Sequence, residues 1–141
     1  MSDGKRSDQV LISNGIVEKN GKFLMVKRDR EWDEKAHNKW EIPGGKVDFG
    51  EKPGKAAVRE VEEETGFMVK SPRLLENVYT HVWEYNSRMS QIVIFPYLCE
   101  LEGGEKDVSD KNVKDVDWFT REEIRELECL PGTEEMLDMA L

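Results

Sequence analysis

The stretch that decides the fold runs from Gly45 to Phe67 and reads GKVDFGEKPGKAAVREVEEETGF. It places a glycine-containing loop, a predicted helix and several carboxylates next to one another. Pro53 suits the first position of a helix, because the N–H that proline lacks would have no partner there. Gly66 suits the residue that ends a helix. The sequence therefore predicts a loop followed by a helix between Pro53 and Gly66.

Three glutamates of this helix, Glu60, Glu63 and Glu64, fall on one side of it. At ~100° per residue they share an arc with Ala56, whereas Glu62 points away. Like charges this close cost ~0.2–0.5 kcal/mol per pair, and the last turns of a helix disfavour anions further. A divalent cation reverses both penalties, and Mg²⁺ and Mn²⁺ prefer such oxygen ligands. The pattern predicts a Mg²⁺ or Mn²⁺ site, the alternative being an acidic face that only contacts water.

The loop and helix together carry a signature, G-x5-E-x7-R-E-U-x-E-E-x-G-U, in which U is apolar. The residues that match it without gaps are Gly45, Glu51, Arg59, Glu60, Val61, Glu63, Glu64, Gly66 and Phe67. On these residues the chain resembles the Nudix hydrolases, and the run HNKWEIPGGKVDFGE from His37 to Glu51 resembles their MutT-type branch. The resemblance implies an α/β fold, namely a Nudix-like α/β/α sandwich with a mixed sheet and a loop–helix–loop metal site.

The resemblance also implies metal ligands and catalytic groups at particular positions. In the family one of these glutamates, or an acid from a distant loop, serves as the base. We expect Glu60 in this role, with Arg59 orienting it and Glu63 beside it. A surface ion pair is the alternative interpretation of Arg59. The implied metal ligands are Glu60, Glu63, Glu64 and a carbonyl oxygen of Gly44 or Gly45, which glycine allows to come close.

Three further residues, Arg28, Lys46 and Glu51, are implied in substrate binding by the same resemblance. Arg28 and Lys46 match substrate-contacting cations of MutT-type enzymes, with a plain exposed cation as the alternative for both. Glu51 either reaches a metal through water or holds its loop by accepting hydrogen bonds from backbone N–H groups. A further acid of the metal site is expected later in the chain, where Asp110 and Asp115 are both candidates.

Length and composition indicate one domain, residues 1–141. The net charge of −9 argues against general binding to nucleic acid or to anionic membranes. No stretch is long enough to span a bilayer, and the N-terminus has no signal-peptide core. Cys99 and Cys129 form neither a disulfide framework nor a zinc motif, so we expect two free thiols and a cytoplasmic location.

Outside the central helix, the residue pattern predicts strands joined by turns. Asn20 and Gly21 fit a hairpin turn because both accept positive φ, and Pro96 requires a bulge or a sheet edge. The expected strands are 10–17, 23–26, 40–42, 69–83 with an interruption at 71–72, 91–101 and 113–118.

Two short helices are expected at the C-terminal end. Thr120 begins the first, which ends near residue 127, because Glu123 completes a capping box. The second is expected over 131–141. Its predicted buried side consists of Met136, Leu137 and Leu141.

The resemblance implies hydrolysis of a phosphoanhydride in a nucleoside diphosphate that is linked to another group. The expected partner is a small-molecule nucleotide, and the expected reaction releases a nucleotide and pyrophosphate from a nucleoside triphosphate. Hydrolysis of ADP-ribose, a nucleotide sugar or a dinucleoside polyphosphate is one alternative. A non-catalytic module that binds a nucleotide and regulates a partner is the other. The sequence leaves open whether the protein is a monomer or a homodimer.

Recognition of the base needs an aromatic or apolar surface and a hydrogen-bonding group. Specificity for oxidised guanine is disfavoured, because Thr133 stands where such MutT-type members carry an asparagine, and a hydroxyl offers fewer hydrogen bonds than an amide. The available aromatic residues are Trp32, Tyr79, Trp83, Phe95 and Trp118.

Overall fold

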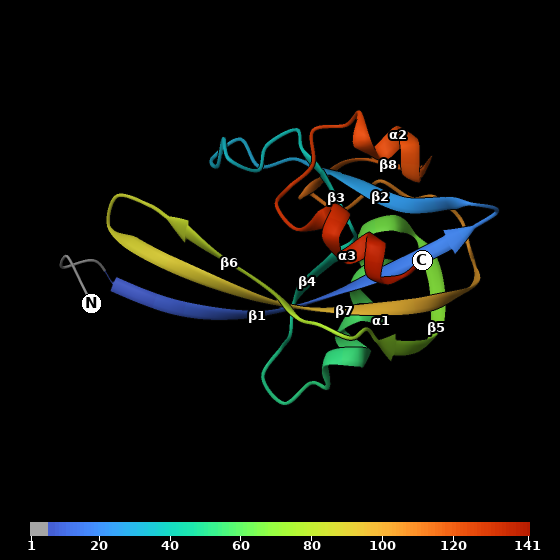
Figure 1. Cartoon of the computed structure of the whole chain (residues 1–141), viewed down its shortest axis with the longest axis horizontal. Coiled ribbons are helices and arrows are strands. Elements are labelled where there is room, and N and C mark those ends of the chain that lie inside the picture. The colour runs from blue at the N-terminus through green and yellow to red at the C-terminus, as the bar shows by residue number, and fades with distance from the viewer. Residues whose placement is uncertain (1–5) are drawn as a thin grey trace.

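The computed structural model describes residues 6–141, in which three helices pack around a set of strands (Figure 1). The first half of the chain forms β1 (Arg6–Lys19), β2 (Lys22–Arg28), β3 (Trp40–Glu41), β4 (Gly44–Lys46) and α1 (Pro53–Thr65). The second half forms β5 (Phe67–Leu74), β6 (Tyr79–Glu84), β7 (Arg88–Gly104), β8 (Val113–Thr120), α2 (Arg121–Arg125) and α3 (Thr133–Met139).

The strands form one sheet with the order β3-β2-β1-β7-β5. At its centre β1 and β7 are parallel, in register from Arg6 opposite Arg88 to Val17 opposite Cys99. Each remaining pair among the described strands is antiparallel, and β4 adds to β1, β6 to β7 and β8 to β2. The predicted mixed sheet is therefore confirmed.

Two apolar clusters occupy the two faces of this sheet, because successive residues of a strand point in opposite directions. Ile16 of β1 packs in the cluster that contains Leu137 of α3. Its neighbour Val17 packs in the cluster that contains Val61 of α1. Since Ile124 of α2 belongs to the first cluster, α2 and α3 cover one face and α1 covers the other. The predicted α/β/α sandwich is confirmed.

Helix α1 has the bounds that the sequence predicts. Pro53 occupies its first turn, and Gly66 ends it with a left-handed φ of 84°. The helix lies very close to the sheet, since a Cβ at Gly15 would be 2.5 Å from Cγ2 of Val61. The buried residues of the helix are Ala56, Ala57, Val61, Glu64 and Thr65. One of the three glutamates is thus carried into the interior with the apolar side.

The central strands extend further than predicted. β1 begins at Arg6 and β7 at Arg88, each several residues before the expected start. Residues 6–9 are polar and exposed, so they carry no apolar strand pattern, yet their backbone continues the parallel pairing. Together with β6 these ends form an arm that reaches away from the helices (Figure 1).

Pro96 does not lie at a bulge or a sheet edge, as the sequence predicts, but in the centre of β7 opposite Asn14. Its missing N–H falls where the partner strand changes, because β6 pairs as far as Ile94 and β5 begins to pair at Tyr97. The interruption predicted at 71–72 is not a break between strands, because β5 continues through these residues, with a register shift between Lys70 and Arg73 and a positive φ of 52° at Ser71. The break lies later, at 75–78, between β5 and β6.

The C-terminal helices largely follow the sequence. The capping box at Thr120 is confirmed, because the Glu123 N–H donates to its hydroxyl at 3.1 Å and its own N–H donates to the Glu123 carboxylate at 2.8 Å. Met136 and Leu137 are buried as predicted. Leu141 is instead 76 % exposed, because α3 ends at Met139 and Leu141 lies beyond it.

The expected free thiols are confirmed for Cys99 and Cys129. Burial raises the pKa of Cys99 to about 12 and that of Cys129 to about 11, so neither is a thiolate at neutral pH. The hairpin turn is confirmed by positive φ at Asn20 and Gly21. Among the helices between residues 6 and 141, none is long and apolar enough to cross a bilayer.

Candidate functional site

The two loop glycines lie beside the helix carboxylates because β4 pairs with β1. Gly44 stands opposite Asn14, and Gly45 stands opposite Ser13. A Cβ at Gly44 would lie 2.5 Å from the Ser13 carbonyl oxygen, so a larger residue could not pack there. A Cβ at Gly45 would lie 2.6 Å from the carboxylate carbon of Glu60. The Glu60 carboxylate therefore occupies the space that a side chain at Gly45 would take.

Arg59 donates hydrogen bonds to three carboxylates, and its Nη2 lies 3.6 Å from a fourth, that of Asp48. Its Nε and Nη2 donate to Glu51 at 2.8 and 2.9 Å, and its Nη1 donates to Glu60 at 2.8 Å and to Glu63 at 3.2 Å. Nη2 also donates to the carbonyl oxygen of Lys46 at 3.1 Å, which ties the helix to the glycine loop. These hydrogen bonds, with those to Glu51 strongest, raise the pKa of Arg59. A single surface ion pair does not describe this network.

Glu51 closes the loop between β4 and α1. Its Oε1 accepts a hydrogen bond from the Asp48 N–H at 2.9 Å as well as one from Arg59. The guanidinium, followed by the Asp48 N–H, lowers the pKa of Glu51 to about 2. Of the two roles considered for Glu51, the loop-holding hydrogen bond is thus present in the structure. Contact with a metal through water stays a prediction.

Glu64 points into the interior, although it follows Glu63 directly. Its Oε1 accepts from the Gly44 N–H at 2.9 Å and from Nη2 of Arg28 at 3.1 Å, and its Oε2 contacts Nη1 of Arg28. Arg28 also contacts Glu41 and donates to the Gly44 carbonyl oxygen at 3.2 Å. Burial, acting against Arg28, raises the pKa of Glu64 to about 7. Arg28 is therefore not the plain exposed cation considered as an alternative.

The three helix glutamates do not converge on one point. Glu60 and Glu63 turn to Arg59, whereas Glu64 turns to Arg28. Glu60 is half-buried, and burial raises its pKa, while the side chain of Glu63 is 51 % exposed. Glu64 could therefore join a metal with the other two only by giving up part of its pairing with Arg28.

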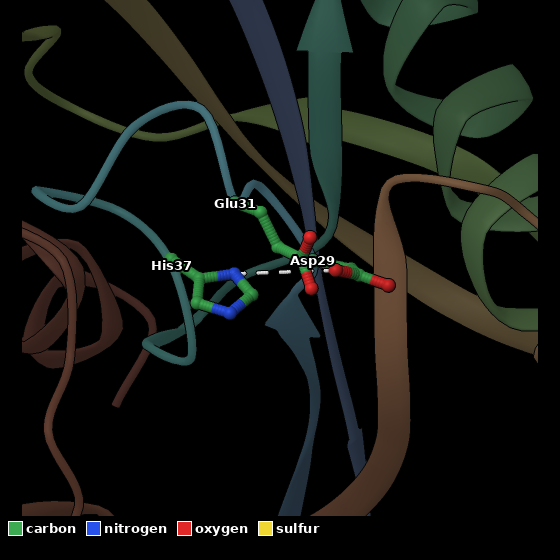
Figure 2. Close-up of side chains that lie close together, drawn as sticks. All are labelled: Asp29, Glu31 and His37. Atoms are coloured by element: carbon green, nitrogen blue, oxygen red, sulfur yellow. Dashed lines mark ion pairs between the residues drawn. The ribbon is translucent and has the colours of Figure 1, made fainter.

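A second group of possible metal ligands lies on the loop after β2, where Asp29, Glu31 and His37 point toward one another (Figure 2). One ligand atom from each lies within 4.8 Å of the others. Nδ1 of His37 is 3.9 Å from Asp29 and already accepts a hydrogen bond from the Arg30 N–H at 2.9 Å. Only Nε2 of the imidazole is then left for an ion. The sequence pattern presents this segment only as a charged loop, although Asp29-x-Glu31 followed by a histidine is a usable signal.

A cleft of about 530 Å³ opens beside the glycine loop, within the ~300–1,000 Å³ that small-molecule sites span. Arg59 and Glu51 are absent from its lining within the described chain. Asp110 lines it, whereas Asp115 does not and instead pairs with Lys106 at 3.2 Å. The cleft brings together most of the predicted site residues, namely Arg28, Gly44, Gly45, Lys46, Glu60, Glu63 and Glu64.

The opposite end of the cleft is aromatic. Trp32 and Trp83, which the sequence offers but does not single out, line it together with Tyr85. Lys35 lies 5.0 Å from the Tyr85 ring centroid, and the Tyr85 hydroxyl donates to Asp33 at 3.3 Å. The loop after β2 thus contacts the tip of the β6–β7 hairpin, and the two close this end of the cleft. Only the folded structure brings these segments together.

Comparisons with known proteins find similar sequences and similar folds. The profile of the NUDIX domain matches residues 10–139. The chain is 34% identical over 94 residues to an 8-oxo-dGTP diphosphatase from Escherichia coli, covering 67% of this chain and 68% of that protein. It is 31% identical over 106 residues to an ADP-ribose pyrophosphatase from Methanocaldococcus jannaschii, covering 75% of this chain and 59% of that protein. A solved NUDIX hydrolase from Nitrosomonas europaea has the same fold, with a TM-score of 0.80, 22% identity and coverage of 94% of this chain and 88% of that one.

Proposed function

The chain belongs to the NUDIX family of hydrolases, and on that premise we propose that it hydrolyses nucleoside triphosphates to a nucleotide and pyrophosphate. The observation that carries this proposal is the charge balance around the helix glutamates that line the cleft. Glu60 and Glu63 line it, and behind them one guanidinium, that of Arg59, pairs with the carboxylates of Glu51, Glu60 and Glu63. The excess negative charge lies where the phosphates of a substrate would have to bind.

The same excess of negative charge bears on whether Glu60 and Glu63 suit a divalent cation. Glu60 and Glu63 line the cleft and are hard oxygen donors. The Glu60 carboxylate fills the space above Gly45, so the loop backbone comes close to it. The donors present therefore fit Mg²⁺ or Mn²⁺, and we propose Glu60, Glu63 and the glycine carbonyl oxygens as its first ligands. Glu64 is proposed to join them from its pairing with Arg28.

In the proposed reaction, a water oxygen attacks phosphorus and the phosphoanhydride bond breaks, so that pyrophosphate leaves with the bridging oxygen. A bound divalent ion supplies polarisation of the phosphate and a lower pKa of the attacking water. Glu60 accepts the proton of that water, and burial favours this role because it raises the pKa of the carboxyl. Arg59 orients Glu60 through the 2.8 Å hydrogen bond.

Phosphate binding is proposed for Lys46, which is exposed and lines the cleft. Arg28 lines the cleft as well, but its side chain is only 2 % exposed. A ligand phosphate can reach Arg28 only in competition with Glu41 and Glu64. Asp110 is the proposed downstream acid, because of the two candidates it alone lines the cleft.

Oxidised guanine is not the substrate that we propose, although one relative is named for it. The hydroxyl of Thr133 donates to the Leu130 carbonyl oxygen at 2.8 Å, and Thr133 is buried. It is therefore not available to a base in the cleft. ADP-ribose is the second candidate, since another relative is named for it and the aromatic end of the cleft offers surface for a further ring.

The experiment is a product-release assay with Mg²⁺ across the nucleoside triphosphates, 8-oxo-dGTP, ADP-ribose and dinucleoside polyphosphates. We expect the nucleoside triphosphates to give the highest kcat/KM, with a nucleotide and pyrophosphate as products. Glu60→Gln should lower kcat by at least about 10²-fold, as loss of a general base does. The matched control is Glu62→Gln, on the exposed side of the same helix, which should keep full activity. Higher kcat/KM for ADP-ribose would favour the second candidate.

A further inference from the structure

Asn14 lies at the floor of the cleft and is not explained by the chemistry proposed above. It belongs to β1, where it stands between Gly44 of β4 and Pro96 of β7. Asn14 is only 4 % exposed, yet it lines the same cleft as Glu60 and Glu64. A polar side chain in this position needs a reason, because buried amides are normally hydrogen-bonded.

The amide of Asn14 is poorly satisfied. Nδ2 donates to the sulfur of Met136 at 3.5 Å, and a thioether is a weak acceptor. Oδ1 has no hydrogen-bond partner among residues 6–141. A half-turn about the Cβ–Cγ bond would exchange the positions of Oδ1 and Nδ2. One of these two atoms would still lack a hydrogen-bond partner. The side chain therefore keeps unused hydrogen-bonding capacity next to the cleft.

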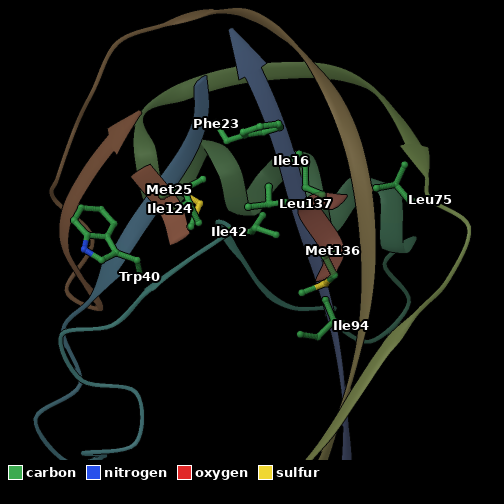
Figure 3. Close-up of a cluster of buried hydrophobic side chains, with 10 residues drawn as sticks. All are labelled: Ile16, Phe23, Met25, Trp40, Ile42, Leu75, Ile94, Ile124, Met136 and Leu137. Atoms are coloured by element: carbon green, nitrogen blue, oxygen red, sulfur yellow. The ribbon is translucent and has the colours of Figure 1, made fainter. Parts of the chain in front are cut away.

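On its own strand and on β7, several residues that line the cleft with this amide are apolar. Ile12, Ile92 and Ile94 line the cleft near it, and Met136 lies close to Ile94 beneath the sheet (Figure 3). A few polar groups among apolar residues are the arrangement by which small-molecule sites fix the orientation of a ring. Oδ1 is covered by its neighbours, so the amide must turn about its Cβ–Cγ bond to meet a ligand. That turn gives up only the weak contact with sulfur.

We propose that Asn14 determines base specificity, by hydrogen-bonding the edge of a purine or pyrimidine that offers a donor and an acceptor. This inference rests on the proposed function, which places the phosphates of the same ligand beside Glu60. The side-chain amide matches such an edge, because it offers one acceptor and two donors. A site built to make this bond discriminates against rings that lack the matching groups, since its own amide is then left unpaired.

The chain offers a matched control in the neighbouring residue. The Ser13 hydroxyl is also buried and without a hydrogen-bond partner in the described chain. Successive strand residues point to opposite faces, and Ser13 does not contribute to the lining of the cleft. Ser13→Ala therefore removes an unsatisfied polar group of the same strand without touching the ligand.

The test is titration calorimetry with Mg²⁺, using the common nucleoside monophosphates and inorganic pyrophosphate as probes. Asn14→Leu should weaken the tightest-binding monophosphate about tenfold, as the loss of one hydrogen bond does, and should level the preference among bases. Pyrophosphate binding should not change, and Ser13→Ala should match the wild type with every probe. If Asn14→Leu does not fold, Asn14→Ser serves in its place.

Two results would overturn this role for Asn14. One is an unchanged ranking of the bases, and the other is an equal loss of monophosphate and pyrophosphate binding, which would indicate a phosphate contact. A wild-type protein that binds no monophosphate also overturns it. Base preference that depends on Asn14 without any turnover of nucleoside triphosphates would instead count against the proposed function alone.

Discussion

Two arginines, Arg28 and Arg59, form ion pairs with carboxylates of helix α1, one in the interior and the other near the surface. The side chain of Arg28 is 2 % exposed and faces Glu64, which is 6 % exposed, together with Glu41. The side chain of Arg59 is 29 % exposed and faces Glu51, Glu60 and Glu63. A buried ion pair cannot lose one partner without leaving a charge in a poorly solvated place. A network that reaches the surface at Arg59 and Glu63 can exchange partners with water or ions there. The consecutive glutamates Glu63 and Glu64 are therefore suited to different roles.

The largest effect expected from this difference is on stability. Arg28→Ala leaves the buried Glu64 and the partly buried Glu41 without their cation, which should lower the free energy of unfolding by about 3–5 kcal/mol. Arg59→Ala should lower it by less than Arg28→Ala does, because the Arg59 side chain is 29 % exposed and that of Glu63 is 51 % exposed, so water screens part of the network. Urea denaturation of both variants beside the wild type measures the two losses. Equal losses would mean that burial does not separate the two arginines.

The second effect separates the two groups of possible metal ligands. Mg²⁺ at 100 times its Kd should add about 2.7 kcal/mol to the free energy of unfolding, because it binds only the folded site. The double variant Glu60→Gln with Glu63→Gln should abolish this gain, whereas Asp29→Asn should keep it. Thermal unfolding with and without Mg²⁺ measures both. If Asp29→Asn abolishes the gain instead, the ion binds the loop group that includes His37.

Local sequence was enough to predict the helix that carries the site. Pro53 and Gly66 fix its ends through backbone preferences that need no tertiary context. The position of Gly45 against Glu60 also agrees with the loop–helix pattern, since the two residues belong to one signature. The helix wheel grouped the three glutamates correctly as one arc with Ala56. It could not show that this arc continues into the interior, because it has no information on what the helix packs against.

The parts that sequence reasoning missed depend on contacts between distant segments. Arg28 and Glu64 are 36 positions apart and meet only because α1 packs against the sheet to which β2 belongs. In the sequence Asn14 looks like an ordinary strand residue. In the structure β4 pairs with β1 at this position, and the sulfur of Met136 in α3 lies 3.5 Å from Nδ2 of Asn14. The polar start of β1 gave no strand signal, because the pairing with β7 is made by backbone groups. Such features follow from the tertiary packing of distant segments rather than from the local backbone preferences of single residues.

The smallest effect is on the pH dependence of stability, and its sign differs between the two surroundings. Hydrogen bonds from Arg59 hold the pKa of Glu51 at about 2, below its ordinary 4.5. Glu51 therefore stabilises the fold above pH 4.5, and this contribution is lost as the pH falls toward about 2. Burial raises the pKa of Glu64 to about 7, so between 4.5 and about 7 the folded state binds more protons than the unfolded state. Glu64 therefore lowers stability as the pH rises through that window.

Thermal unfolding from pH 2 to pH 8 can separate these two slopes. Glu51→Gln should differ from the wild type most at neutral pH and converge with it near pH 2, where Glu51 itself becomes protonated. Glu64→Gln should flatten the decline between pH 4.5 and about 7, because the amide keeps an acceptor for Arg28 without a charge to ionise. Glu62→Gln, on the exposed side of the helix, serves as the control. A wild-type profile whose decline above pH 4.5 survives in Glu64→Gln would show that the buried carboxylate is ionised throughout, with Arg28 outweighing burial.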